Sequence, residues 1–270
     1  MSLCLFRRLS SALHLWYDRD MDSSKEELFI VFGGGCFGTH HVRHIEKGRK
    51  RGRISEDARI IMVDRNAHPP ALDLPEVAEN PHLTFVRSDW LEYMKRTWEL
   101  FPPDTEVVPA PVAPHLAFEW LVWSLRKRLG QGAIGIEPVT HEFGGLPYEY
   151  LDPSGCRYIS AANWICPTNC RAPHVCPMIR DVRTWELEDT VKDYASAHLD
   201  LFAGSVVFKP RFRVPGIDTL TIKEYTGARD QILALITQPE SWGKGVVVGT
   251  VSSCHGAVSL LTLPHIHSRF

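Results

Sequence analysis

The segment 165–177, with the sequence ICPTNCRAPHVCP, places the thiols of Cys166, Cys170 and Cys176 within eleven positions. The spacing C-x3-C-x5-C differs from the paired C-x2-C knuckles of most structural zinc sites. Clustered thiolates bind soft metals such as zinc, copper(I) or the iron of iron–sulfur clusters. The spacing therefore favours a metal centre, with reduced or disulfide-forming thiols as the alternative. A catalytic thiol needs one cysteine and a base such as His174, so three cysteines exceed what that chemistry requires.

The ending Cys176-Pro177 is similar to the cysteine runs of bacterial ferredoxins, whose thiolates surround a [4Fe-4S] cluster. The resemblance implies iron–sulfur before zinc, although the gaps between the cysteines differ from the ferredoxin pattern. Such a cluster has four irons, and this segment supplies three sulfurs. Cys254, in SSCHG after an expected strand, is the preferred fourth ligand, with His255 and Cys156 as alternatives. Without a fourth ligand, the open iron is a Lewis acid that can bind a substrate.

A second pattern with chemical meaning is GGGCFG, which matches G-x-G-x-x-G through Gly33, Gly35 and Gly38. It follows the apolar run 28–33 and precedes an expected helix at 39–50. The first glycine allows a tight turn, the second lets a pyrophosphate approach the backbone, and the third lets helix and strand pack closely. The free N–H groups at the start of the helix then attract phosphate.

An acid follows the glycine loop at the end of the next apolar run, 58–64. Asp64 stands where an acid accepts hydrogen bonds from the adenine ribose of a dinucleotide. It lies 26 residues after Gly38, and the basic loop 47–57 accounts for the extra length. Arg65 beside it could instead favour the 2′-phosphate of NADP, so the sequence favours NAD over NADP only slightly.

This part of the chain resembles Rossmann nucleotide-binding domains, most closely the regulatory domains of potassium-uptake systems. The matching positions are Gly33, Gly35, Gly38, Asp64 and Asp89, and the resemblance covers about residues 28–100. It implies a bound NAD or NADP. The proline-rich stretch after residue 101 departs from the family pattern. The alternative is a Rossmann-like fold whose loop binds another phosphate ligand, or none.

Strands alternating with helices must position these loops. Strands are expected at 28–33, 58–64, 82–87, 105–108 and 133–139, and helices at 39–50, 88–100 and 114–129. This alternation predicts a parallel sheet with right-handed crossovers. Residues 109–114 are expected as a loop at the carboxyl edge of the sheet, where open α/β sheets bind ligands.

The pattern changes after residue 139. Two short strands are expected around the turn 152–155, followed by the cysteine segment, helices at 185–199 and 227–236, and strands at 204–210, 245–251 and 257–263. We therefore predict an α/β fold: a flexible tail over 1–24, a Rossmann-like, mostly parallel sheet over 25–139, and an α+β part with the cysteine cluster over 140–270. The last part can also complete the first sheet rather than stand alone.

Composition excludes several classes of protein. The formal net charge of −2 gives no overall basic field and argues against nucleic acid as a partner. No run approaches the ~18 apolar residues of a membrane span. Seven cysteines without a signal peptide argue against a disulfide framework and for the cytoplasm, although residues 1–20 faintly resemble a transit peptide.

Three further groups have ordinary explanations beside their chemical ones. His40 and His44 share a helix face and could bind a metal, but surface histidines are commoner. The basic run 43–53 could contact a phosphate or RNA, and a solvated loop is preferred. Lys209, Arg211 and Arg213 could line an anionic pocket or decorate an exposed edge strand.

Together these patterns predict an NAD(P)-binding iron–sulfur redox protein. Whether it is an enzyme, an NAD(P)-linked oxidoreductase, stays open, as do its small-molecule substrate and its electron-transfer partner. The sequence leaves room for a homo-oligomer. The alternative is a non-enzymatic, nucleotide-sensing regulatory protein with a structural zinc or iron–sulfur site.

Overall fold

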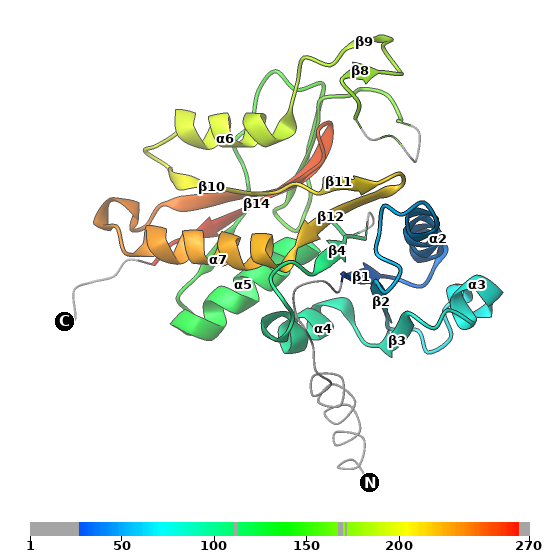
Figure 1. Ribbon diagram of the computed structural model, residues 1–270. Helices are drawn as coiled ribbons and strands as arrows, with labels where there is room; N and C mark the ends of the chain where they lie inside the picture. The colour runs from blue at the N-terminus through cyan, green and yellow to red at the C-terminus, as the bar shows by residue number, and fades with distance from the viewer. Residues whose placement is uncertain (1–26, 111–112, 167–169, 171, 265–270) are drawn as a thin grey trace.

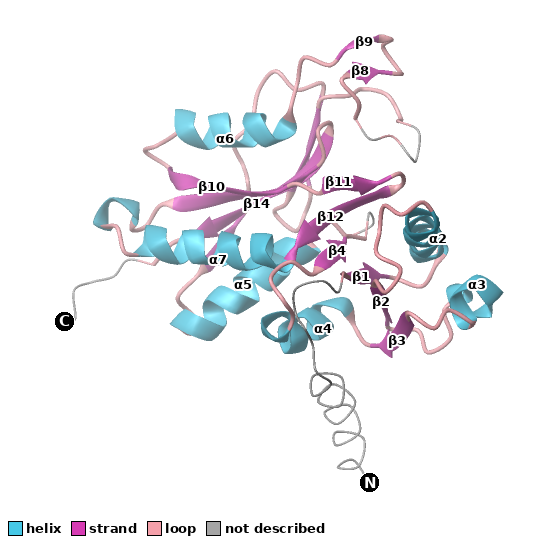
Figure 2. Ribbon diagram, viewed as in Figure 1, coloured by secondary structure: helices cyan, strands magenta, loops and turns pink. Residues whose placement is uncertain are grey.

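The computed structural model describes residues 27–110, 113–166, 170 and 172–264. The predicted tail 1–24 and the terminal histidines, His265 and His267, lie outside the described residues. The protein has a mixed α/β fold (Figures 1 and 2). Within the described residues, no helix has the length and apolar character needed to cross a membrane.

The first sheet has the strand order β11-β12-β4-β1-β2-β3. Its strands are β1 (Leu28–Phe32), β2 (Arg59–Asp64), β3 (Leu83–Arg87), β4 (Glu106–Val108), β11 (Arg211–Val214) and β12 (Ile217–Thr221). β1 pairs in parallel with β2 and β4, and β2 with β3, as the alternation of elements predicts. β12 joins β4 antiparallel, so a hairpin from late in the chain extends this sheet.

The second sheet has the order β10-β13-β14-β7-β6, and β5 pairs with β14 off this path. Its strands are β5 (Gly135–Glu137), β6 (Tyr148–Leu151), β7 (Arg157–Ser160), β10 (Phe202–Phe208), β13 (Gly245–Val251) and β14 (His255–Thr262). The expectation that 133–139 forms a fifth strand of the first sheet is wrong. Residues 135–137 pair antiparallel with β14, where Ile136 lies opposite Leu261.

Helices cover the sheets in layers. They are α2 (Cys36–Lys50), α3 (Pro75–Ala78), α4 (Trp90–Thr97), α5 (Leu116–Leu129), α6 (Leu187–Ala197) and α7 (Ile222–Ile236), with short 3-10 turns at Pro70–Asp73, Trp98–Leu100 and Pro239–Ser241. α2 packs on one face of the first sheet. α5 and α7 lie between the two sheets, α4 packs beside α5 on the first sheet, and α6 covers the outer face of the second (Figure 1).

One apolar core joins the two sheets through the middle layer of helices. It contains Val107 from the first sheet, Trp120 from α5, Ile232 from α7 and Val248 from the second sheet, all of them buried. Burial of each large apolar side chain contributes about 2 kcal/mol. Because this core takes residues from both predicted parts, the division at residue 139 does not coincide with a break in packing, and the predicted boundary stays a prediction.

Helix ends in the middle layer carry the expected local signals. Thr221 and Glu224 form a capping box at the start of α7, in which each side chain binds the other residue's backbone N–H. α5 ends at Gly130, whose φ of +102° is a conformation that glycine adopts without strain. These caps fix where β12 passes into α7 and where α5 turns toward β5.

Candidate functional site

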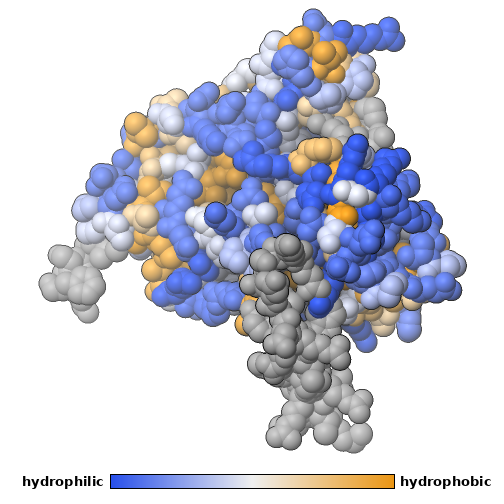
Figure 3. Space-filling view, viewed as in Figure 1, coloured by the Kyte–Doolittle hydropathy of each residue, from blue (hydrophilic) through white to orange (hydrophobic). Residues whose placement is uncertain are grey.

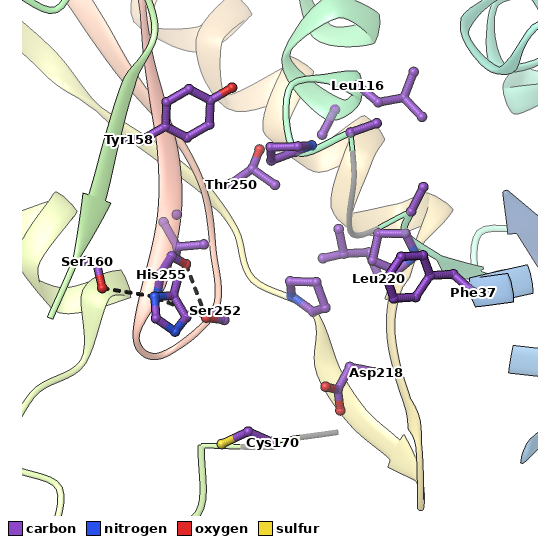
Figure 4. A pocket seen from close by; sticks show the side chains of 18 of the residues that line it. Phe37, Leu116, Tyr158, Ser160, Cys170, Asp218, Leu220, Thr250, Ser252 and His255 are labelled. Atoms are coloured by element: carbon purple, nitrogen blue, oxygen red, sulfur yellow. Dashed lines mark hydrogen bonds between the residues drawn. The ribbon is translucent and has the colours of Figure 1, made fainter. Parts of the chain in front are cut away.

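A cavity of about 1390 Å³ lies between the two sheets, at the carboxyl ends of β1 and β4. One wall is the first turn of α2, with Cys36 and Phe37. A second wall is formed after β4 by Pro109, Ala110, Ala113, Pro114 and Leu116. The opposite wall comes from β7, the β13–β14 turn and the cysteine segment, and Figure 4 shows His255 and Cys170 there. The cavity therefore borders both sequence patterns that could do chemistry.

The glycine loop leaves β1 in the geometry that its sequence predicts. Gly33 has a φ of +93°, and its N–H donates to the carbonyl oxygen of Val63 across 2.8 Å. The next N–H, that of Gly34, donates to Oδ2 of Asp64 across 2.7 Å. The other oxygen of Asp64 accepts from the N–H of Asn66 at 2.7 Å. Asp64 thus ties the glycine loop to the end of β2.

The three pattern glycines differ in the space around them. A Cβ on Gly38 would overlap the carbonyl oxygen of Gly33, so helix and loop approach each other too closely for any side chain. A Cβ on Gly35 would meet nothing within 4 Å. Gly34, between them, is covered by Pro69, whose Cβ would lie 2.5 Å from an added one. The third glycine therefore serves packing, and the second leaves open space at the helix start.

Two other residues predicted to contact the cofactor lie outside the cavity lining. Asp89 is the N-cap of α4, where its Oδ1 accepts from the N–H of Glu92 across 3.2 Å. Arg65 is exposed beside Asp64. Neither lines the cavity, and nor do Gly33, Gly35, Gly38 and Asp64 themselves. The residues of α2 that line it are their neighbours Cys36, Phe37, His40 and His41.

Cys254 lies in the tight turn between β13 and β14, and it is buried. Its carbonyl oxygen accepts from the N–H of Ala161 across 2.9 Å, at the end of β7. The adjacent carbonyl, that of Ser253, accepts from the N–H of Leu187 at the start of α6. Contacts on both sides thus hold the turn, and they fix where the Cys254 thiol lies.

Cys176, near the end of the cysteine segment, lies on a small hairpin that precedes α6. β8 (Val175–Cys176) pairs antiparallel with β9 (Asp181–Val182), and the N–H of Arg180 donates to the carbonyl of Cys176 across 2.8 Å. Cys176 is buried, whereas Val175 and Val182 are exposed. Figure 3 shows apolar side chains gathered over this hairpin at the top of the molecule. The hairpin therefore directs its sulfur inward.

The four candidate thiols lie close enough to influence one another. Burial raises the pKa of Cys166, and the Cys170 thiol raises it further, with a smaller contribution from Cys254. Burial likewise raises the pKa of Cys254, and both Cys170 and Cys176 add to that rise. Cys254 is therefore close to the cysteine segment in the fold although it is far from it in the sequence, as the proposed ligand set requires.

Two indole rings flank the thiols. The N–H of Trp185 donates to Sγ of Cys254 across 3.3 Å, and Trp164 contacts Trp185 edge to face with ring centroids 6.0 Å apart. The nearby indole of Trp164 lowers the pKa of the Cys166 thiol, against the larger effect of burial. N–H groups aimed at sulfur are characteristic of the surroundings of metal thiolates, because they stabilise charge on the sulfur.

Within the ranges that the structure describes, no three His, Cys, Asp or Glu side chains are spaced as a formed metal site. The two remaining described cysteines lie elsewhere. Cys156 is buried at the start of β7, where burial raises the pKa of its thiol. Cys36 is exposed at the first turn of α2. A metal at the four clustered thiols therefore stays a prediction.

The secondary candidates have structural roles. The rings of His40 and His44 lie 4.2 Å apart on α2, and Nδ1 of His44 contacts the carbonyl oxygen of Pro215. In the basic run, Arg43 pairs with Glu76 on α3. Lys209, Arg211 and Arg213 make ion pairs with Glu186, Glu224 and Glu106 respectively. β11 is the edge strand of its sheet, as the alternating charges predict.

The sequence did not single out His41 or the pair of Ser160 with His255. His41 lies one helical turn after Phe37 and lines the cavity. Oγ of Ser160 lies 2.9 Å from Nδ1 of His255, across the β7–β14 pair (Figure 4). Their strands pair in register at these two residues, which are 95 positions apart, so no local pattern could have revealed the contact.

Comparison with known proteins places the chain in a family. The family model AF_1314_C, described as "Uncharacterized protein, C-terminal domain", matches residues 117–264, and the chain belongs to this family. The matched range contains all four clustered cysteines and the second sheet. A curated relative, an uncharacterized protein of Archaeoglobus fulgidus, is 26% identical over 246 residues, which cover 86% of this chain and 98% of the relative. No solved structure matches.

Proposed function

We propose that the chain is an NAD(P)-binding redox protein whose iron–sulfur centre is held by Cys166, Cys170, Cys176 and Cys254. The observation that carries the proposal is the single cavity bordered both by the first turn of α2 and by Cys170. A nucleotide at the glycine loop and a metal at the thiols would then lie on opposite walls of one cavity. Zinc at the same thiols is the alternative metal.

The topology of the first sheet supports a dinucleotide. Its parallel strands run in the order β3-β2-β1-β4, so successive connections leave in opposite directions from β1. This order supports a Rossmann-like arrangement, in which ligands bind outside the carboxyl ends of the strands at the point where the order reverses. Phe32 at the end of β1, the first turn of α2 and the loop after β4 line the cavity at that point.

The glycine loop fits a pyrophosphate. The open space around Gly35 lets a phosphate approach the backbone, and the unpaired N–H groups at the start of α2 favour negative charge there. Asp64 holds Gly34 and so fixes the loop shape. An adenosine ribose beside β2 would compete with these backbone N–H groups for the Asp64 carboxylate.

The cluster of four thiols fits a soft metal. The four sulfurs come from a hairpin, a connecting segment and a strand turn, and Trp185 supplies an N–H to one of them. When bound, a [4Fe-4S] cluster exchanges single electrons, whereas a nicotinamide exchanges two. The rings of Trp164 and Trp185 contact each other, and the indole of Trp185 lies against the Cys254 thiol.

A second function has one specific observation in its favour. Between β7 and α6, the described residues form no regular structure except β8 and β9, of two residues each. A metal ion that crosslinks such a segment stabilises it directly, as structural zinc does in small domains. The protein would then be a nucleotide-sensing regulatory protein whose zinc or iron–sulfur site is structural.

Anaerobic purification followed by metal, sulfide and absorption analysis tests the proposal. The expected result is iron and sulfide with a broad absorption near ~400 nm that bleaches on reduction, as is typical of iron–sulfur proteins. Calorimetry should then show binding of NAD or NADP to the same preparation. Colourless protein with one zinc per chain would favour the regulatory alternative. Protein that takes up neither iron nor zinc would contradict both.

A further inference from the structure

The cavity is lined mainly by apolar side chains beyond the glycine loop. Figure 4 shows several of them pointing into it from both sheets and from α5. The apolar lining includes Phe32, Phe37, Leu116, Ile159, Leu220 and Val251. A volume of about 1390 Å³ exceeds the ~300–1,000 Å³ of typical ligand pockets, so it has room for a second molecule beside a nucleotide.

The lining carries almost no charge. Among the described residues that line the cavity, Asp218 is the one with a formal charge at neutral pH. Three histidines also line it: His40, His41 and His255. Burial lowers the pKa of His41 to about 4 and also lowers the pKa of His40, so neither adds a positive charge at neutral pH.

Cations next to the cavity are directed elsewhere. Pro210 lines it, but its neighbour Lys209 pairs with Glu186 at 2.9 Å. Arg213, on the edge strand β11, pairs with Glu106 at 2.7 Å. An anionic group that entered the apolar part would lose its hydration without a counter-charge from these side chains, and that loss costs several kcal/mol.

Two polar atoms on opposite walls of the cavity can recognise an uncharged group. His41 is buried, with 8% of its surface exposed, yet its Nδ1 has no hydrogen-bond partner among the described residues. A buried polar atom of this kind is normally satisfied, so a ligand that supplies the missing partner would gain affinity.

The second polar atom belongs to His255. Oγ of Ser160 donates to the carbonyl of Ala162 at 2.7 Å, and it receives the N–H of Ala162 at 3.0 Å. Its one proton is then committed, so Nδ1 of His255, 2.9 Å away, must be the donor in that pair. Because Nδ1 is engaged with Ser160, Nε2 is the ring atom of His255 that is left to contact a ligand.

We propose that this part of the cavity binds an uncharged, predominantly apolar organic molecule that carries a hydrogen-bonding oxygen. His41 and His255 are the polar contacts, and the apolar side chains supply most of the buried surface. The inference rests on the proposed function in that the molecule would be the second substrate beside the nucleotide. The binding preference itself can be measured without nucleotide or turnover.

The test uses two fluorescent probes with the same rings, N-phenyl-1-naphthylamine and its 8-sulfonate, added to the full chain as purified. The uncharged amine should bind about ten-fold tighter than the sulfonate. Equal affinities, or tighter binding of the sulfonate, would overturn the inference. Loss of nucleotide binding with the probe preference retained would overturn the proposed function alone.

A charged residue introduced into the cavity wall tests whether the probes bind inside the cavity. Thr250 lines the cavity at the end of β13. T250K should weaken binding of the amine and strengthen binding of the sulfonate, each by about ten-fold. T237K, at the exposed end of α7, is the matched control and should change neither. Should T250K fail to fold, Y148K at the exposed rim of the cavity replaces it. Unchanged affinities in a folded variant would place the probes elsewhere and overturn the inference.

Discussion

The indole N–H of Trp185 donates a hydrogen bond to Sγ of Cys254 across 3.3 Å. The two residues are 69 positions apart, and the contact joins the start of α6 to the β13–β14 turn. If Cys254 is a metal ligand, this N–H stabilises the negative charge on its sulfur, and it does so most in the reduced state.

Replacing Trp185 by phenylalanine should therefore keep the metal and lower its reduction potential by tens of millivolts. A hydrogen bond to a charged group contributes about 1.5–3 kcal/mol, of which only the difference between the two redox states affects the potential. W242F is the control, because the indole of Trp242 donates to Ile236 far from the thiols. Spectroelectrochemical titration measures both variants. An unchanged potential in W185F would show that Cys254 does not bind the metal.

Removing one clustered thiol should remove the metal, and removing an outlying one should not. C170A should lose most of its bound metal while it remains folded, since a missing ligand typically costs much of the affinity of such a site. C156A is the control, because Cys156 lies outside the cluster at the start of β7. Metal analysis and circular dichroism give the result. Equal metal content in the two variants is the contrary outcome.

The raised pKa values of Cys166 and Cys254 make metal uptake depend on pH. In the metal-free protein both thiols are protonated at neutral pH, and a metal must displace those protons. Zinc affinity should therefore rise about ten-fold or more per unit between roughly pH 6 and 8. Competition with a chelator measures it. An affinity that does not change with pH would contradict the assignment of these thiols as ligands.

The same pKa shifts affect the stability of the metal-free protein in a known direction. A folded-state pKa raised above the unfolded value contributes stability that is complete below the unfolded pKa and is lost as the pH rises through the folded pKa. Denaturant unfolding of the metal-free chain should show this loss in the alkaline range. C166A should show a smaller loss, because one such thiol is gone.

Alanine substitutions at two glycines of the loop should distinguish a role in packing from a role in nucleotide binding. G38A forces a methyl group onto the Gly33 carbonyl and should destabilise the fold by about 3 kcal/mol. G35A meets nothing within 4 Å and should cost about 1 kcal/mol or less. It should nevertheless weaken NAD or NADP binding about ten-fold, because the methyl group occupies the space for phosphate. Normal nucleotide binding by G35A would refute a pyrophosphate at this position.

Asp89 should act on stability alone. D89A removes the N-cap of α4 and should cost about 1 kcal/mol. Its nucleotide affinity should match the unaltered protein, because Asp89 does not line the cavity. Denaturant unfolding and calorimetry check the two statements. A clear loss of affinity in D89A would restore the cofactor role that the sequence resemblance implies.

Local patterns predicted most elements but not all of their partners. The run GVVVGTV gave the bounds of β13 without error, because a short apolar run between turns has few other conformations. The run at 133–139 also contains a strand, yet its partner is β14, more than a hundred residues away. Alternation of apolar residues shows that a segment is extended. It does not show which neighbour its backbone will bind.

The residues of the candidate site also differ in whether local sequence could reveal them. The glycine loop and the cysteine segment were evident because their chemistry is written in adjacent residues. His41 was not, because a histidine on a helix looks the same whether it faces solvent or a cavity, and only the packing of α2 against the later hairpin decides. Trp185 was missed because its partner, Cys254, comes from a different element.

The pairing of β12 with β4 has a consequence for biosynthesis. During translation, β4 leaves the ribosome more than a hundred residues before its antiparallel partner, and until then its outer edge presents unpaired backbone groups. The nascent chain must therefore carry an open sheet edge while the whole cysteine segment is being made. Chaperones that shield such edges, and the moment at which metal is delivered, would then act on the same incomplete intermediate.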